Sequence, residues 1–413
     1  MKRSLALFMS ALLVLLTVSA CSAPKKENTS NNQTPGGKPA AGTDANTTKS
    51  AGQGDPLIIG SSLALTGGFG YAGSSMKEAM DLLVEKVNAG GGISGRPLKI
   101  IYYDDENIPE NAVRNANKLI KNDKVKIILG PSVGATSKAV QPIADQEKVI
   151  MYSMSGAYIA PNGSYGFSSS YGQDAMHEVI HKWLLEKGIK AAGMIATNDV
   201  SGDISVDIVN KLQGKDGIKY VIDRMGVNDV DITPQLTKMR KEGIGTLVVI
   251  GPGAAAGVAI QNSKKLKFDM PIIATHSQLS DLFAKSIKDF IPDKMYFTGP
   301  PIAAYQELSD SNIFKPKLKA YSDEFKAKYK KNPDYFSAIA YDTLSLVIEG
   351  LKKVGNDPEK MKAYLETGVK DFTGIHAIFN MTAQDHRGTT SKGVPLLRLD
   401  KDLSWHIEWE PKL

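Results

Sequence analysis

Short apolar segments alternate with amphipathic helical segments along most of this 413-residue chain. Residues 57–64 are almost entirely apolar, and residues 75–88 then repeat apolar side chains at the spacing of one helix face. Further strands are predicted at 98–103, 125–129, 149–153, 191–196, 246–250, 271–274, 295–298 and 394–399. Helices are predicted at 112–120, 137–146, 175–187, 233–243 and, as two long helices, within 311–355. This alternation requires parallel sheets that helices cover on both faces.

The alternation breaks after residue 153 and resumes with the helix at 175–187. Once the first 55 residues are set aside, about 360 residues remain, which is more than a single core usually accommodates. The predicted fold class is therefore α/β, with two doubly wound parallel-sheet lobes. In this architecture, ligands bind at the carboxyl ends of the strands.

The N-terminus has the pattern of a bacterial export signal. Lys2 and Arg3 precede an apolar stretch, residues 5–18, which is too short for a stable transmembrane helix. Residues 18–21, Val-Ser-Ala-Cys, resemble the lipobox of bacterial lipoproteins. We therefore expect a signal peptide at 1–20 and a lipid-modified Cys21. The protein would then be extracytoplasmic, anchored at the outer face of the cell membrane or in the periplasm.

Residues 21–55 contain Ser, Asn, Thr, Gly, Pro and a few Lys, with hardly a bulky apolar side chain. Such a composition cannot offset the entropy of ordering, so a disordered tether is predicted here. The formal net charge of the whole chain is only +6, and the folded part contains no basic run. This balance argues against nucleic acid as a partner. No later apolar stretch is long enough to span a membrane.

Gly68, Gly70 and Gly73 have the spacing G-x-G-x-x-G between a predicted strand and helix. A dinucleotide-binding turn also needs an acidic residue about 20 positions later, at the end of the next strand. Here Asp104 and Asp105 come 31 and 32 residues after Gly73, behind an inserted glycine-rich turn. Because export also separates the chain from nicotinamide cofactors, we expect a loop that approaches another ligand.

His177, Glu178 and His181 form H-E-x-x-H, the zinc-peptidase pattern, on a predicted helix. The apolar face of this helix predicts that the histidines lie on its flank and that Glu178 points away from the core. No third ligand follows in a recognisable pattern, and the chain has no G-x-S-x-G motif. The single cysteine, Cys21, is assigned to lipidation, so no thiol nucleophile remains. Neither an enzyme activity, a metal nor a cofactor is expected.

The chain resembles the periplasmic branched-chain-amino-acid-binding proteins, the solute receptors of ABC importers with the type I periplasmic-binding fold. The matching stretches are 65–73 (LTGGFGYAG), 87–107, 115–128, 130–144 and 149–157, with weaker matches at 231–239, 272–277 and 379–388. The resemblance implies two lobes, joined by three crossovers, that close over a ligand. It places lobe 1 at 56–172 plus 300–376 and lobe 2 at 173–299 plus 377–413.

The resemblance also implies a ligand site at the strand ends of both lobes. The site residues carried over are Phe69, Tyr71, Ser132, Gly134, Ser153, Ser155, Ala157, Ser201 and His276. Several depart from the family pattern. The hydroxyl of one loop falls on Gly134, for which Ser132 could substitute, and the family threonine falls on Ala157. The family aromatic of the first loop is displaced by one position to Tyr71.

The most consequential departure concerns the acid that pairs with the ligand's ammonium group, because this position falls on His276. A desolvated ammonium needs a carboxylate nearby. Either Asp199 or Asp203 takes over this role, or the placement is shifted by a residue or two, or the ligand has changed. The expected ligand is a branched-chain amino acid or a related small, partly apolar carboxylate, such as an aromatic or aliphatic acid.

The resemblance implies a monomeric binding protein that delivers solute to ABC permease and ATPase subunits and has no catalytic activity. A ligand-sensing lipoprotein of the same fold, which reports to a signalling receptor, is the alternative. Both would use the same cleft between the lobes, so the sequence alone leaves them open.

Overall fold

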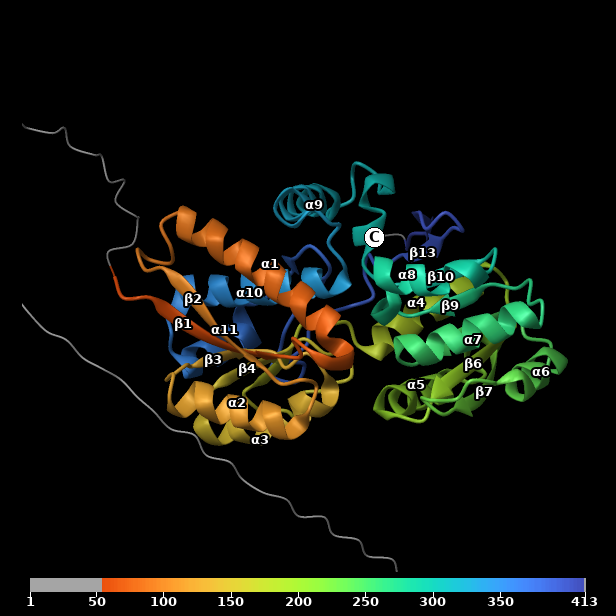
Figure 1. Cartoon of the computed structure of the whole chain (residues 1–413), viewed down its shortest axis with the longest axis horizontal. Coiled ribbons are helices and arrows are strands. Elements are labelled where there is room, and N and C mark those ends of the chain that lie inside the picture. The colour runs from red at the N-terminus through yellow and green to blue at the C-terminus, as the bar shows by residue number, and fades with distance from the viewer. Residues whose placement is uncertain (1–53, 412–413) are drawn as a thin grey trace, which may run out of the picture. The chain divides into compact units, whose positions relative to one another are not determined.

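A computed structural model describes residues 54–411. These residues belong to one compact unit, residues 50–413, which contains two large β-sheets (Figure 1). The predicted signal peptide, Cys21 and nearly all of the predicted tether lie outside the described residues. Within the described part, no helix is both long and apolar enough to cross a membrane.

The first sheet is entirely parallel and has the strand order β2-β1-β3-β4-β5. Its strands are β1 (Leu57–Leu63), β2 (Leu98–Asp104), β3 (Ile127–Leu129), β4 (Ile150–Ser153) and β5 (Gly166–Ser168). Helices α2 (Pro109–Lys121) and α3 (Gly134–Glu147) pack together on one face and bury a core with β3 and β4. Helix α1 (Gly70–Ala89) covers the other face together with α10 (Tyr335–Val354), as Figure 1 shows. The first lobe is this sheet with its helices.

The second sheet has the order β14-β13-β10-β9-β8-β6-β7 and is parallel except for β13 and β14 at one edge. Its strands are β6 (Ala191–Thr197), β7 (Lys219–Met225), β8 (Thr246–Ile250), β9 (Ile272–Ala274), β10 (Met295–Thr298), β13 (Leu396–Leu399) and β14 (Trp405–Trp409). Its helices are α4 (Gln173–Glu186), α5 (Val200–Leu212), α6 (Thr233–Lys241), α7 (Gly253–Lys265) and α8 (Asp281–Ile287). These elements make the second lobe.

The chain passes between the sheets three times: after β5, between β10 and α10, and between β12 and β13. The second crossover carries α9 (Lys315–Tyr329), and α11 (Pro358–Gly368) follows α10. A two-stranded hairpin, β11 (Phe372–Thr373) and β12 (Ile378–Phe379), precedes the third crossover. Short 3-10 turns lie at Gly67–Phe69, Lys215–Gly217, His276–Gln278, Lys288–Phe290, Pro301–Ala303 and Tyr305–Glu307. The predicted fold class, with two parallel-sheet lobes and three crossovers, is confirmed.

Two details differ from the sequence-based expectation. The first helix begins at Gly70 instead of Ser75. In addition, His386 remains beside the first sheet: its ring stacks on Phe167 at 4.2 Å, and its Nδ1 lies 2.7 Å from the carbonyl oxygen of Gly166. The chain therefore leaves the first lobe well after residue 376, where the resemblance placed the boundary.

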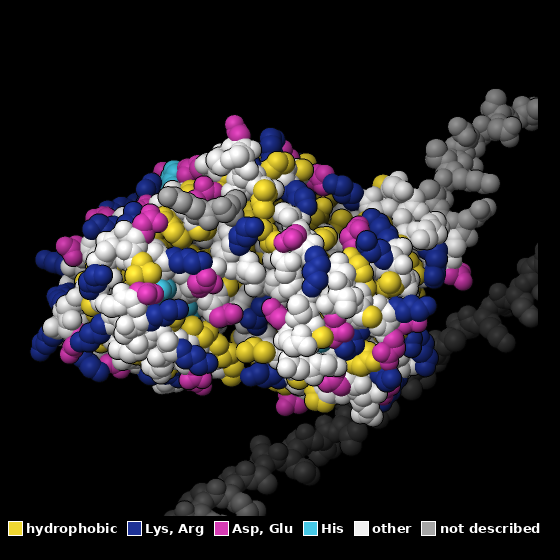
Figure 2. All heavy atoms as spheres, turned by 180° about the vertical axis from the view of Figure 1, so that it is seen from behind, with side chains coloured by type: hydrophobic (Ala, Val, Ile, Leu, Met, Phe, Trp, Pro, Cys, Tyr) yellow, Lys and Arg dark blue, Asp and Glu magenta, His cyan; other side chains and the backbone are white. Residues whose placement is uncertain are grey.

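The surface seen in Figure 2 carries Lys and Arg side chains interspersed with Asp and Glu. Neither sign gathers into a broad patch on this face. The two charge types are also paired in many places, for example Lys86 with Glu324 and Lys219 with Glu242.

Candidate functional site

The loop after β1 is the first part of the candidate site, and Asp104 of β2 holds it in place. The Asp104 carboxylate accepts hydrogen bonds from the backbone N–H groups of Leu65 (2.9 Å) and Thr66 (3.4 Å) and from the Thr66 hydroxyl (2.6 Å). Burial raises the pKa of Asp104, but the hydrogen bonds from Thr66, Glu106 and Leu65 outweigh it and lower the pKa below its ordinary value. Asp104 therefore fixes the loop after β1.

The glycines of this loop are explained by close packing. A Cβ atom on Gly73 would lie 1.9 Å from the carbonyl oxygen of Ala64, and one on Gly70 would lie 2.9 Å from that of Leu65. Only glycine lets α1 begin this close to the end of β1, which is why the helix starts within the motif instead of after it. The G-x-G-x-x-G spacing thus needs no dinucleotide.

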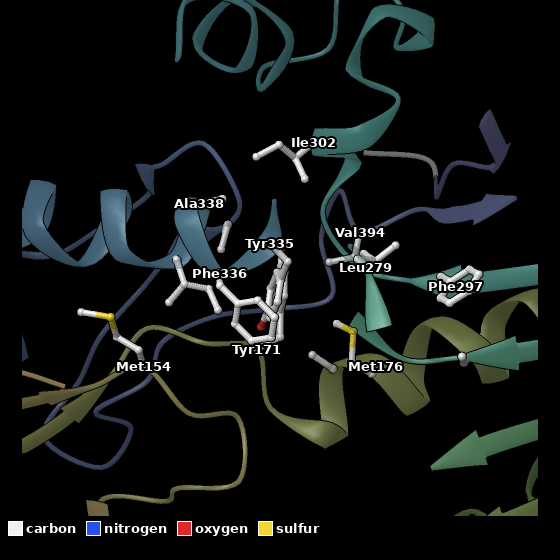
Figure 3. Close-up of a cluster of buried hydrophobic side chains, with 14 of the residues drawn as sticks. Met154, Tyr171, Met176, Leu279, Phe297, Ile302, Tyr335, Phe336, Ala338 and Val394 are labelled. Carbon is white, nitrogen blue, oxygen red and sulfur yellow. The ribbon is translucent and has the colours of Figure 1, made fainter. Parts of the chain in front are cut away.

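An aromatic wall stands beside this loop. The rings of Phe69, Tyr71 and Phe336 contact one another in pairs, with centroids 5.5 to 5.7 Å apart. Tyr335 extends the wall, because its ring lies 5.6 Å from that of Phe336. Figure 3 shows Phe336 and Tyr335 at the start of α10, with Tyr171 of the first crossover next to Tyr335. Phe69 and Tyr71 were predicted, whereas the two α10 residues were not.

The loops after β3 and β4 contribute hydroxyl groups that hold backbone. Ser132 Oγ accepts a hydrogen bond from the N–H of Ala64 at 3.2 Å. Ser153 Oγ lies 2.8 Å from Ser137 Oγ and accepts from the N–H of Ser155. Ser155 Oγ in turn accepts from the N–H of Ala157. The predicted serines of the first lobe therefore shape the loops in this structure.

Gly134 completes this part of the first lobe. A Cβ atom there would lie 3.0 Å from the carbonyl oxygen of Ala157, so the two loops are in direct contact. The structure thus brings together Ser132, Gly134, Ser153, Ser155 and Ala157, all at the carboxyl ends of β3 and β4. This is the sheet edge at which doubly wound folds bind their ligands.

His276, in the 3-10 turn after β9, faces the first lobe. Its ring lies 4.8 Å from that of Tyr335 and 6.5 Å from that of Tyr171. A Cβ atom on Gly156 would come within 3.4 Å of its Nε2. The side chain is 5% exposed, and Nδ1 has no hydrogen-bond partner. Burial, with smaller contributions from Arg387 and His376, lowers the pKa of His276 to about 3.

Three predicted residues lie around the start of α5. They are Ser201 and the two acids considered as substitutes for the family carboxylate, Asp199 and Asp203. Gln173 Nε2 donates to Ser201 Oγ at 2.8 Å. Asp199 caps the helix by accepting from the N–H of Gly202 and the hydroxyl of Thr197, both at 2.8 Å. Asp203 pairs with Arg224. Both carboxylates are thus engaged by the second lobe itself.

Arg387, in the third crossover, was missed by the residue-level prediction, although it lies within the weakly matching stretch 379–388. Its Nη2 donates to the carbonyl oxygens of Tyr158 (2.6 Å) and Gly156 (3.3 Å). Its Nη1 lies 3.5 Å from Asp174, whose side chain is 75% exposed. A guanidinium group therefore underlies the loop that His276 faces. Arg387 and the site loops are far apart in sequence, so only the topology brings them together.

Three cavities adjoin these loops. The α7–α8 cavity has a volume of about 440 Å³ and is lined by Tyr71 and by residues of α7 and α8. The Trp405 cavity, of about 250 Å³, shares Tyr71, Ser280 and Leu282 with it and also contains Asp334. The hinge cavity, of about 460 Å³, is lined by residues that include Gly156, Gln173 and Arg387. Tyr71 thus lines two of these cavities, and Gly156 lines the third.

The H-E-x-x-H motif on α4 is structural. Both histidines are buried, His177 at 3% and His181 at 6% exposed, so the prediction that they lie on the flank of the helix was wrong. His181 Nδ1 lies 2.7 Å from the Tyr220 hydroxyl and Nε2 lies 3.2 Å from Asp216. Glu178 pairs with Lys182 on the surface. Among residues 54–411, no group of three or more His, Cys, Asp and Glu residues could hold a metal ion.

Comparison with known proteins gives consistent results. Residues 56–402 match the family model described as periplasmic binding protein. The chain is 25% identical, over 313 residues, to the leucine-, isoleucine-, valine-, threonine-, and alanine-binding protein of Pseudomonas aeruginosa, covering 74% of this chain and 81% of that protein.

Solved structures give the same fold. An extracellular ligand-binding receptor from Rhodopseudomonas palustris HaA2 superposes with a TM-score of 0.75 at 21% identity, covering 85% of this chain and 99% of that one. The branched-chain amino acid transporter substrate binding protein from Streptococcus pneumoniae, in complex with isoleucine, has a TM-score of 0.70 at 20% identity, covering 86% of this chain and 100% of that one. At these identities, the likeness concerns the fold.

Proposed function

Because the chain belongs to the periplasmic binding protein family, a family of binding proteins and not of enzymes, we propose that it is the extracytoplasmic solute-binding component of an ABC importer. The observation that carries this proposal is the opposition of the two lobes. The loops after β1, β3 and β4 face the turn after β9, and His276 of one lobe lies against Gly156 of the other. Such a site can bind a solute between the lobes and release it when they separate.

The proposed solute is a small, partly apolar carboxylate, either a branched-chain amino acid or a related acid. The apolar part would lie against the aromatic wall of Phe69, Tyr71, Phe336 and Tyr335. The polar part would lie at the loops after β3 and β4, where serine hydroxyls and backbone groups lie at strand ends. Sites of this kind combine an apolar lining with a few fixed polar groups.

Closure would follow from bending at the three crossovers. We propose that lobe 1 comprises residues 56–172 and 300–388 and that lobe 2 comprises residues 173–299 and 389–413, because His386 and Arg387 contact Gly166 and Tyr158 of lobe 1. The closed form would present both lobes to permease subunits, so that binding and delivery depend on the same movement. We expect the protein to act as a monomer.

We further propose that Cys21 carries the lipid that anchors the protein to the outer face of the cell membrane. The tether over 21–55 would let the folded part reach the permease. Labelling with a radioactive fatty acid in the native host tests this directly. The wild type should incorporate the label, and Cys21→Ser should not. Label on the variant would contradict the assignment.

The solute can be identified by mass spectrometry of the natively purified protein, followed by unfolding, dialysis and refolding to obtain a ligand-free sample. A ligand present at 100 times its Kd should stabilise the folded state by about 2.7 kcal/mol. We expect a clear rise in Tm with at least one small carboxylate. If no amino acid or organic acid shifts the Tm, and none co-purifies, the proposed solute class is wrong.

A further inference from the structure

We propose that the ligand is a carboxylate with an apolar body and no ammonium group, so that 2-oxo, 2-hydroxy or aromatic acids bind and the corresponding amino acids do not. This inference rests on the proposed function, because it narrows the solute class of the same site. The argument concerns which charges the site can accommodate, and it starts from the carboxylates that surround the site.

An ammonium group that leaves water needs a carboxylate or an equivalent set of acceptors. The buried and partly buried carboxylates at the strand ends are already engaged: Asp104 holds the first loop, and Asp105 accepts from Ser62 and from the N–H of Asn107. Asp334 caps α10 and accepts from the Ser75 hydroxyl at 2.7 Å. Asp199 caps α5. Each is thus committed to holding backbone or hydroxyl groups of the protein itself.

The other carboxylates near the region between the lobes point to solvent. The side chain of Asp174 is 75% exposed and that of Asp203 is 66% exposed, and each faces an arginine. Asp281, at the start of α8, is also exposed. In water such a group gives little net attraction to an ammonium, since both charges keep their hydration. Each buried carboxylate named above thus already accepts hydrogen bonds from the protein itself, and the solvent-facing ones are weak partners for an ammonium.

His276 of the second lobe lies against Gly156 of the loop after β4. Because burial lowers its pKa to about 3, its imidazole is uncharged at neutral pH. An uncharged ring cannot neutralise an ammonium, but it can exchange a hydrogen bond with an oxygen. Its Nδ1 is buried without a partner. A ligand oxygen that entered when the lobes separate would supply this partner.

A buried positive charge lies behind the loop after β4. Arg387 donates to the carbonyl oxygens of Gly156 and Tyr158, so its guanidinium lies directly behind the loop that faces His276. Its side chain is only 16% exposed, and its Nε has no partner. In an environment of low dielectric, a fixed positive charge attracts a carboxylate and repels an ammonium. Asp174 and Asp385 also act on this guanidinium, but both are exposed to solvent, so the buried charge behind the loop is positive and favours an anion.

The apolar body of the ligand has a matching surface. The α7–α8 cavity is lined entirely by uncharged side chains, among them Tyr71, Leu282 and Phe283. Together with Phe69 and Phe336 it offers a wall for an aromatic or branched aliphatic group. Its polar lining residues, Gln261, Ser277, Ser280 and Ser286, carry no charge that could neutralise a charged substituent. The charge of the ligand therefore belongs at the polar end only.

Isothermal titration calorimetry on the refolded, ligand-free protein tests the inference with ligand pairs that share a carbon skeleton. The pairs are 4-methyl-2-oxopentanoate with leucine and phenylpyruvate with phenylalanine. We expect the oxo acid of at least one pair to bind at least tenfold more tightly than its amino acid. If leucine or phenylalanine binds as tightly as its oxo acid, the inference is overturned and the proposed function stands. If no member of either pair binds, and mass spectrometry finds no carboxylate, both fail.

Substitution at His276 gives a second, independent test. His276→Glu adds the missing negative charge, so it should weaken oxo-acid binding at least tenfold and improve amino-acid binding. His276→Gln keeps an uncharged hydrogen-bonding group and should preserve the order of preference. Glu178→Gln, on the exposed side of α4, serves as the matched control away from the site. Equal behaviour of the Glu and Gln variants would overturn the role of charge. Should His276→Glu fail to fold, the wild-type pairs still decide.

Discussion

His376 and His276 are both buried histidines next to Tyr335, but their surroundings differ completely. His376 is 0% exposed, with Nδ1 2.5 Å from Asp342 Oδ2 and Nε2 2.9 Å from the carbonyl oxygen of Ser169. His276 is 5% exposed and its Nδ1 has no partner. One imidazole is fully used by the protein, and the other keeps an unused hydrogen-bonding atom at the junction of the lobes.

The saturated contacts belong to the hinge. The first crossover is held by α10 and the segment after it: Ser169 Oγ lies 2.5 Å from Thr343 Oγ1, Ser170 Oγ lies 2.7 Å from the Tyr335 hydroxyl, and the Tyr171 hydroxyl donates to the carbonyl of His376. Buried polar groups that are all paired specify one arrangement. The comparison shows that the polar groups of the first crossover are paired within the protein, whereas His276 keeps an atom that a ligand can bind.

The largest loss of stability is expected from a substitution of Asp342, whose carboxylate holds the segment after α10. Its carboxylate accepts from His376 Nδ1 and from the N–H groups of Ile375 and His376. Asp342→Asn removes the negative charge and turns an amide group toward these donors, which should cost about 3–5 kcal/mol of unfolding free energy. Urea denaturation measures it. Glu349→Gln, whose carboxylate pairs with Lys352 on the exposed face of the same helix, should change stability by less than about 0.5 kcal/mol.

In the G-x-G-x-x-G motif after β1, Gly73 and Gly68 have different surroundings. Gly73→Ala would place a Cβ atom 1.9 Å from the Ala64 carbonyl oxygen and push α1 away from β1, costing about 3 kcal/mol. Gly68→Ala meets nothing within 4 Å and should be nearly neutral. The same denaturation experiment compares them. Equal stability of the two variants would show that the motif is retained for a ligand and not for packing.

The pH dependence of stability reports on the burial of His276. The unfolded chain protonates His276 near its ordinary pKa of 6.5, whereas the folded protein does so only near 3. Below pH 6.5 the unfolded state therefore binds more protons, so stability falls as the pH drops from 6.5 toward 3. One such group contributes about 1.4 kcal/mol per pH unit in this window, or about 2 kcal/mol at pH 5.

The check is a comparison of unfolding free energies at pH 7 and pH 5. His276→Phe should lose about 2 kcal/mol less than the wild type over this interval. His177 behaves in the same sense, because burial lowers its pKa to about 4, so His177→Phe provides a parallel test away from the site. A pH dependence unchanged by His276→Phe would mean that the pKa of His276 is the same in the folded and the unfolded chain, so that burial does not lower it.

The smallest loss of stability is expected at Tyr335, which contacts both His276 and the first crossover. Tyr335→Phe keeps the ring against His276 but loses the hydroxyl contact with Ser170 across the first crossover. The loss of one such hydrogen bond should cost about 1 kcal/mol. Thermal unfolding measures it, and Ser170→Ala should cost a similar amount. The double variant should cost clearly less than the sum of the single variants, because both remove one contact.

Much of the fold could be predicted because it depends on local periodicity. The strand predicted at 57–64 corresponds to β1, and the two long helices predicted within 311–355 are α9 and α10. The start of α1 was missed because Gly70 and Gly73 usually signal a loop, whereas here their missing side chains permit a helix to pack against a strand. Local propensity could not reveal that tertiary reason.

The site was predicted less completely, for a topological reason. The structure gathers Ser132, Gly134, Ser155 and Ala157 at strand ends that follow one another in the chain. Tyr335, Phe336 and Arg387 arrive through the second and third crossovers, more than 150 residues away. No periodicity marks such residues. The burial of His276, which removes its charge, also depends on the opposing lobe.

All three tryptophans of the chain, Trp183, Trp405 and Trp409, belong to α4 and β14 of the second lobe. Trp405 lines the Trp405 cavity together with Tyr71 of α1 and Asp334, which caps the start of α10. Both α1 and α10 belong to the first lobe. The ring of Trp405 also packs against Phe297 with centroids 5.0 Å apart, which holds it in place. Tryptophan emission therefore arises from the second lobe only, and Trp405 lies beside residues of the first lobe. We therefore expect the tryptophan emission of the native protein to change when the lobes close, without an added label.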